Sequence, residues 1–146
     1  MFIERKYDSA QEKKNVSPLS NVGGNTILLV EDDASNVEML QLLIGMETTY
    51  SVISFERAEE VIQRIEEVKA IKPILFLLDY HLPLKNALEL YDYLHATEGL
   101  EQVSAIIISA SLKKEIIEEI EKRNICFLYK PFDVDYFLHL LERVLA

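Results

Sequence analysis

Acidic, hydroxyl and lysine side chains stand where four apolar segments of the chain end. Glu31 and Asp32 follow TILLV, Asp79 follows PILFLL, Ser109 closes SAIIIS, and Lys130 follows ICFLY. Carboxylates gathered in one place repel one another and need cations beside them. An oxygen-rich set of this kind suits Mg²⁺, which keeps several waters and shares its shell with phosphates. These residue types favour phosphoryl transfer, in which protein groups mainly position the reactants and neutralise charge.

The spacing also suggests a role for each side chain. Asp79 stands alone at its segment end and is the candidate nucleophile, which would become an aspartyl phosphate. Glu31 and Asp32 are adjacent and form the better metal-binding pair. Lys130 supplies a fixed positive charge opposite the carboxylates, and Pro131 fixes the turn behind it. Asp33 is expected to cap the helix that follows rather than to bind metal.

Five short apolar segments alternate with five segments of helical periodicity, which predicts a strand and helix unit repeated five times. Strands that are apolar on both faces and separated by helices favour an α/β fold with a parallel sheet covered on both sides. We expect a doubly wound five-stranded sheet, because right-handed crossovers leave few alternatives. The order 2-1-3-4-5 makes the first and third strands neighbours, so that Glu31, Asp32 and Asp79 converge. The expected helices cover residues 34–46, 56–68, 86–97, 112–123 and 133–146.

Length and composition bound the class of protein. The 146 residues predict one domain over residues 26–146, preceded by a flexible tail or linker over residues 1–25. The formal charge of −10 argues against direct nucleic-acid binding. The apolar segments are far shorter than the roughly 20 residues of a membrane span, so no membrane insertion is expected. The single cysteine, Cys126, is compatible with a reducing cytoplasm.

With these residues in view, residues 26–146 resemble the receiver domain of two-component response regulators, which has a flavodoxin-like sheet. The sequence ILLVEDD is similar to the acidic motif of that family's first strand, and LLDYHLP to its phosphoacceptor turn. IIISAS is similar to the hydroxyl motif of the fourth strand, and FLYKPF to the Lys-Pro motif. Four motifs in the family's order, each at a strand end, make the resemblance specific.

The resemblance implies a phosphoacceptor site. Asp79 would receive a phosphoryl group from a phosphohistidine on a sensor histidine kinase or a histidine phosphotransfer protein. Mg²⁺ would be held by Glu31, Asp32 and Asp79, together with the backbone carbonyl of His81. Lys130 and Ser109 would bind the phosphate oxygens, and the Lys130–Pro131 peptide bond would be cis.

The resemblance also implies a switch. Ser109 and Phe127 would move when Asp79 is phosphorylated, and the fourth helix, fifth strand and fifth helix would form the signalling surface. His81 and Ser111 occupy positions that tune the lifetime of the phosphate. Two departures from the family pattern stand out: Phe127 lacks a tyrosine hydroxyl, and Asn86 with Ala87 replaces the frequent Asp-Gly pair, so that turn has no glycine.

The expected protein is therefore a cytoplasmic signalling domain rather than an enzyme, although it assists its own phosphorylation and dephosphorylation. One alternative is a degenerate receiver that serves only as an interaction module. A less favoured alternative is a Mg²⁺-dependent phosphohydrolase that works through an aspartyl intermediate. The sequence is compatible with a stand-alone regulator and with a piece of a larger protein, and with several kinases, output partners and oligomeric states.

Overall fold

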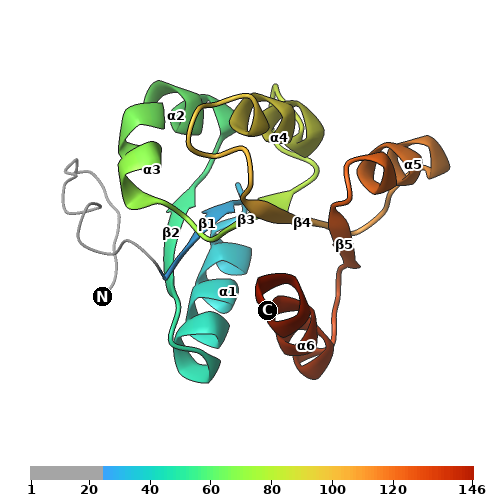
Figure 1. Cartoon of the computed structure of the whole chain (residues 1–146). Helices are drawn as coiled ribbons and strands as arrows, with labels where there is room; N and C mark the ends of the chain where they lie inside the picture. Colours follow the sequence, from blue (N-terminus) through green and yellow to red (C-terminus); the bar gives the residue numbers. More distant parts are fainter. Residues whose placement is uncertain (1–24) are drawn as a thin grey trace.

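The structure, a computed structural model, describes residues 25–146, so nearly all of the expected tail lies outside the described residues. This part of the chain contains five strands and six helices, and each strand is followed by one helix except β2, which is followed by two. Figure 1 shows their arrangement around a central sheet. In chain order they are β1 (Thr26–Val30), α1 (Ala34–Glu47), β2 (Ser51–Phe55), α2 (Ala58–Gln63), α3 (Ile65–Ile71), β3 (Leu75–Asp79), α4 (Ala87–His95), β4 (Ser104–Ser109), α5 (Lys114–Lys122), β5 (Cys126–Tyr129) and α6 (Val134–Leu145).

The sheet is parallel throughout and has the order β2-β1-β3-β4-β5, which confirms the predicted topology. All five residues of β1 and all five of β3 are buried, as expected for inner strands covered by helices on both faces. The pairing of Val30 with Leu78 brings the ends of β1 and β3 to the same height. The residues that follow these two strands therefore meet at the carboxyl edge of the sheet.

Helices cover the two faces of the sheet unequally. α1 and α6 lie on one face, and α2, α3, α4 and α5 lie on the other (Figure 1). Alternate residues of each strand supply the two cores, as the period of a strand requires: Ile27 and Leu29 point to the first, Leu28 and Val30 to the second. This packing makes the strands rigid supports for the loops at their ends.

The helix predicted over residues 56–68 is in fact two helices, and this count is the main correction to the expected architecture. The backbone of Arg64 has φ −109° and ψ 30°, which separates α2 from α3. The guanidinium of Arg64 lies 5.4 Å from the centre of the Phe55 ring and forms an ion pair with Glu67. The bend lets Val61 and Val68, on the two sides of it, both reach full burial in one core.

Side-chain caps begin the two helices nearest the strand ends. Asp33 accepts a hydrogen bond from Asn36 N at 3.1 Å and is the N-cap of α1, as predicted. Asn86 is the N-cap of α4 and forms a reciprocal capping box with Glu89. The absence of glycine from this turn is thereby explained, because the N-cap has φ −79° and needs no left-handed conformation.

Replacing Asn86 with alanine is expected to lower the free energy of unfolding by about 1 kcal/mol, the usual cost of a lost N-cap. The reason is that the backbone N–H of Glu89 would lose its acceptor at the start of α4. Urea denaturation followed by far-ultraviolet circular dichroism measures the change. Asn86→Asp, which keeps an acceptor at the helix N-terminus, is the matched control and should stay near wild type; equal losses in both variants would contradict the capping role.

Candidate functional site

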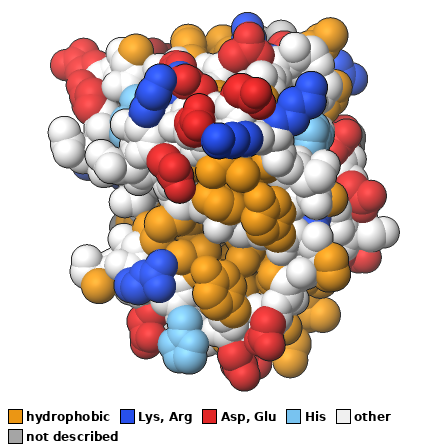
Figure 2. Space-filling model, turned by 90° about the vertical axis from the view of Figure 1, so that its right-hand side faces the viewer, with side chains coloured by type: hydrophobic (Ala, Val, Ile, Leu, Met, Phe, Trp, Pro, Cys, Tyr) orange, Lys and Arg blue, Asp and Glu red, His pale blue; other side chains and the backbone are white. Residues whose placement is uncertain are grey.

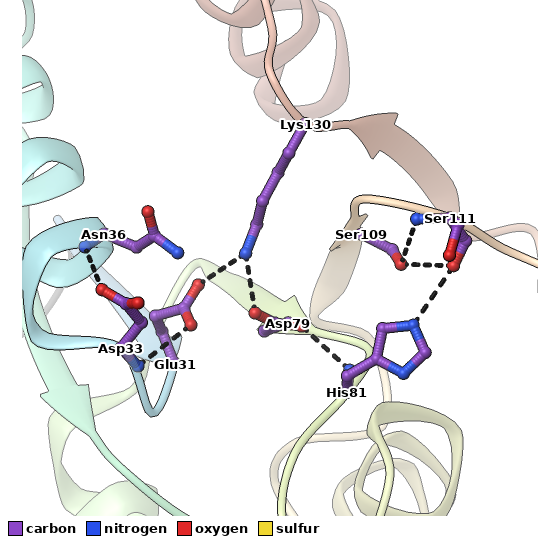
Figure 3. Close-up of polar contacts among 8 residues, drawn as sticks. All are labelled: Glu31, Asp33, Asn36, Asp79, His81, Ser109, Ser111 and Lys130. Atoms are coloured by element: carbon purple, nitrogen blue, oxygen red, sulfur yellow. Dashed lines mark hydrogen bonds and ion pairs between the residues drawn. The ribbon is translucent and has the colours of Figure 1, made fainter.

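Three of the four segment ends predicted to carry chemistry converge on one point at the carboxyl edge of the sheet. Glu31 follows β1, Asp79 ends β3, and Lys130 follows β5 and extends across the edge toward both (Figure 3). Lys130 Nζ lies 2.8 Å from Asp79 Oδ2 and 3.1 Å from Glu31 Oε1. The lysine therefore balances two carboxylates at once, which accounts for its position at the end of β5.

Burial makes this cluster unusual. Glu31 is 1% exposed and Asp79 is 6% exposed, whereas acidic residues are almost never fully buried without partners. Backbone donors complete the set: Asp33 N donates to Glu31 Oε2 at 3.2 Å, and His81 N donates to Asp79 Oδ1 at 2.9 Å. Both carboxylates are thus held in place by one lysine and one backbone N–H each, an arrangement that fixes their oxygens.

The two buried carboxyl groups have pKa values shifted in opposite directions. Burial raises the pKa of Glu31 to about 7, and a hydrogen bond with Asp79 and repulsion by its charge add to the shift. For Asp79, burial opposes ionisation, but hydrogen bonds from Lys130, Glu31 and His81 outweigh it and lower the pKa. Asp79 is therefore the anionic member of the pair, as a nucleophile must be.

Lys130 remains a cation. Partial burial works against its charge, but hydrogen bonds to Asp79 and Glu31 and their attraction raise the pKa of the lysine above its usual value. A cation that is held between two carboxylates and keeps its charge can also neutralise negative charge that arrives at Asp79.

The donor set fits a hard divalent cation. One oxygen from each carboxylate of Glu31, Asp32 and Asp79 lies within 4.8 Å of the others, and Asp32 is the exposed member. Mg²⁺ prefers such all-oxygen sets and keeps several waters, for which the exposed side at Asp32 leaves room. Asp33 points its carboxylate to the N-terminus of α1 instead.

Ser109, the fourth predicted residue, is buried at the end of β4, and its backbone carbonyl accepts a hydrogen bond from Lys130 N at 2.9 Å, but its hydroxyl bonds to Ser111. Its Oγ donates to the carbonyl of Ser111 at 2.7 Å, and Ser111 N donates back to Ser109 Oγ at 3.2 Å. The Nε2 atom of His81 lies 3.2 Å from the same carbonyl (Figure 3). One carbonyl thus joins the loop after β3 to the loop after β4.

The remaining predicted residues take separate positions. Phe127 lies in β5, is partly buried, and packs edge-on against Tyr129 with 5.4 Å between ring centres. The Lys130–Pro131 peptide bond is cis. Sequence reasoning named the carbonyl of His81 but missed its backbone N–H and its ring contact with Ser111, because no residue pattern encodes which loops touch.

Replacing Glu31 with glutamine is expected to stabilise the metal-free protein by about 1 to 3 kcal/mol at pH 8. A raised folded-state pKa means that folding opposes ionisation of Glu31, and this cost is fully present above pH 7. Glutamine removes the charge and keeps an oxygen for Lys130. Urea denaturation in EDTA measures the gain, and Glu38→Gln on the exposed face of α1 is the control. A loss of stability specific to Glu31→Gln would contradict this account.

Comparison with known protein families gives a match over most of the chain. The model of the response regulator receiver domain matches residues 27–142 of the chain. No curated protein sequence matches the chain.

Solved structures provide a second comparison. A signal receiver domain from Vibrio parahaemolyticus has a TM-score of 0.70 and 25% identity, with 83% of this chain and 89% of that chain covered. A response regulator receiver protein from Pseudomonas putida has a TM-score of 0.71 and 24% identity, covering 81% of this chain and 95% of the other. The receiver domain of a sensor histidine kinase from Pseudomonas aeruginosa, with magnesium coordinated in its active site cleft, has a TM-score of 0.71 and 22% identity, covering 84% and 98%.

Proposed function

Because the chain belongs to the response regulator receiver domain family, we propose that Asp79 accepts a phosphoryl group from a phosphohistidine in a Mg²⁺-dependent reaction. The observation that carries the proposal is the placement of Asp79: its carboxylate is buried, anionic and 2.8 Å from Lys130 Nζ, within the group of three carboxylates. The donor is a sensor histidine kinase or a histidine phosphotransfer protein, and the domain acts as a signalling module rather than as an enzyme with a turned-over substrate.

The chain's own residues supply the nucleophile and its positioning. An oxygen of Asp79 attacks the phosphorus; the new P–O bond forms as the P–N bond to the donor imidazole breaks, and the imidazole nitrogen keeps the electron pair and takes up a proton. Lys130 neutralises the transferred group at Asp79. Glu31, Asp32, Asp79 and the carbonyl of His81 would hold Mg²⁺, which shields the negative charges of nucleophile and phosphoryl group.

The response to phosphorylation involves Ser109 and Phe127. Ser109 Oγ leaves the carbonyl of Ser111 to donate to a phosphate oxygen, and the partly buried ring of Phe127 moves inward. His81 and Ser111, which touch each other beside Asp79, control access of water and hence the lifetime of the phosphate. A phosphate brings about −1.5 to −2 charges, enough to bias a two-state surface.

The signalling surface in this proposal is the groove between α5, β5 and α6, which are the fourth expected helix, the fifth strand and the fifth expected helix. Its volume is about 540 Å³, and Figure 2 shows hydrophobic side chains in a hollow on this face of the molecule. Phe127, Tyr129 and Tyr136 are among its lining residues, so the proposed switch residue forms part of the groove itself. The partner is a protein, and within the described residues no helix is long and apolar enough to cross a membrane.

Intact-mass analysis after incubation with acetyl phosphate tests the proposal. We expect one phosphoryl adduct with Mg²⁺ and none with EDTA, and borohydride reduction of the acyl phosphate should locate the modification at Asp79. An adduct on another residue, or none in the folded protein, would contradict the proposal and favour the interaction module. Steady release of phosphate from small phosphorylated substrates would favour the phosphohydrolase.

A further inference from the structure

Leu84, in the loop between β3 and α4, combines two unfavourable features. Its φ is 67°, in the left-handed region that side chains other than glycine and asparagine rarely adopt. Its side chain is 85% exposed, the highest value among the large exposed hydrophobic residues of the described chain. Lys85 N donates to the carbonyl of Pro83 at 2.7 Å and closes a turn around Leu84 that resembles the strained form of the γ-turn.

Other left-handed residues have an ordinary explanation that Leu84 lacks. Lys72 is the C-cap of α3, and Asn124 follows α5, and such positions at helix ends commonly adopt this conformation. Leu84 ends no helix. Burial of the Leu84 side chain does not offset the cost of the left-handed backbone either, because most of this side chain is exposed to water.

The loop is held at both ends, so its shape is set before any partner arrives. Ala87 N donates to the carbonyl of Tyr80 at 3.3 Å, and the capping box of Asn86 fixes the start of α4. Leu82, which is 8% exposed, anchors the middle of the loop in the core. Leu84 is therefore presented at a set position, five residues after Asp79 in the same loop.

We propose that Leu84 is an apolar contact for the phosphodonor protein, seated against an apolar patch beside its phosphohistidine. The inference rests on the proposed function, since a protein that brings a phosphohistidine to Asp79 must approach the loop that follows this residue. A small donor such as acetyl phosphate reaches Asp79 without needing Leu84. The residue thus favours protein donors over small ones.

The test compares two phosphoryl donors with the full chain. The protein donor is a phosphorylated histidine phosphotransfer protein, selected from a panel as the one that phosphorylates the wild type fastest; the small donor is acetyl phosphate. For Leu84→Gly and Leu84→Asn we expect at least a tenfold lower transfer rate at low concentrations of the protein donor, recovered at saturation. The rate with acetyl phosphate should stay within about twofold, since its phosphoryl transfer uses no apolar contact.

Three controls separate this role from a structural one. Leu84→Met keeps an apolar side chain and should retain transfer from the protein donor. Lys72→Gly relaxes a left-handed residue at the end of α3 and should not affect transfer. Because glycine adopts positive φ freely, Leu84→Gly should melt at or above the wild-type temperature even though it transfers more slowly.

The outcomes are distinct. Wild-type transfer rates from the protein donor in Leu84→Gly, or equal losses with both donors, would overturn the role of Leu84 while leaving phosphorylation of Asp79 intact. A wild type that accepts phosphate from neither donor would overturn the proposed function itself. A loss confined to the protein donor and rescued in Leu84→Met would support the contact.

Discussion

Replacing Asp79 with asparagine is expected to abolish the Mg²⁺-dependent phosphoryl adduct, with no residual modification above the background of the reaction without donor. Asparagine has nearly the same shape and can still accept the hydrogen bond from His81 N, so the loop after β3 should keep its conformation. It has no anionic oxygen, so it provides no carboxylate nucleophile. Intact-mass spectrometry after incubation with acetyl phosphate measures the effect.

The matched control for this loss is Asp135→Asn, which changes the same residue type on the exposed first turn of α6. This variant should be phosphorylated at the wild-type rate. A Mg²⁺-dependent adduct that persists in Asp79→Asn would move the phosphoacceptor to another side chain and would require a new assignment of the site. Circular dichroism of both variants checks that they remain folded.

Replacing Lys130 with methionine is expected to slow phosphorylation by about 100-fold, the usual effect of removing one group that stabilises charge in a transition state. Lys130 is the cation nearest to Asp79 in the described chain, 2.8 Å away. Methionine fills a similar volume without a charge. The initial rate of adduct formation with acetyl phosphate and Mg²⁺ measures the change.

The same variant should also be less stable without Mg²⁺, by about 1 to 3 kcal/mol. Glu31 and Asp79 are both buried, and they would face each other without their shared cation. The expected loss of stability is smaller than the full cost of breaking a buried ion pair, because the Lys130 side chain is 22% exposed to water. Lys114→Met, which changes an exposed lysine at the start of α5, is the control. Wild-type rate and stability in Lys130→Met would show that the lysine is not needed to balance the carboxylates.

The two largest expected effects concern Asp79 and Lys130, which the sequence already placed at the ends of predicted strands, and the reason is geometric. In a parallel sheet all strands end at one edge, so the residues after β1, β3 and β5 share that edge whatever the details of packing. Apolar runs and helical spacing, combined with right-handed crossovers, predicted the sheet order, and an aspartate directly before the first helix predicted the cap at Asp33. The pattern did not predict the break at Arg64, because apolar residues continue at spacings of three and four on both sides of this residue.

The sequence by itself therefore determined the class of fold and which side chains stand at strand ends, since these follow from local periodicity. The order of the strands followed only when the rule of right-handed crossovers was added. Only the tertiary structure decided how the side chains pair. Lys130 lies 99 residues from Glu31 and 51 from Asp79, and the raised pKa of Glu31 depends on burial by several elements. The link between His81 and Ser111 and the left-handed backbone of Leu84 are likewise set by contacts and loop closure, which depend on distances in space rather than on spacing along the chain.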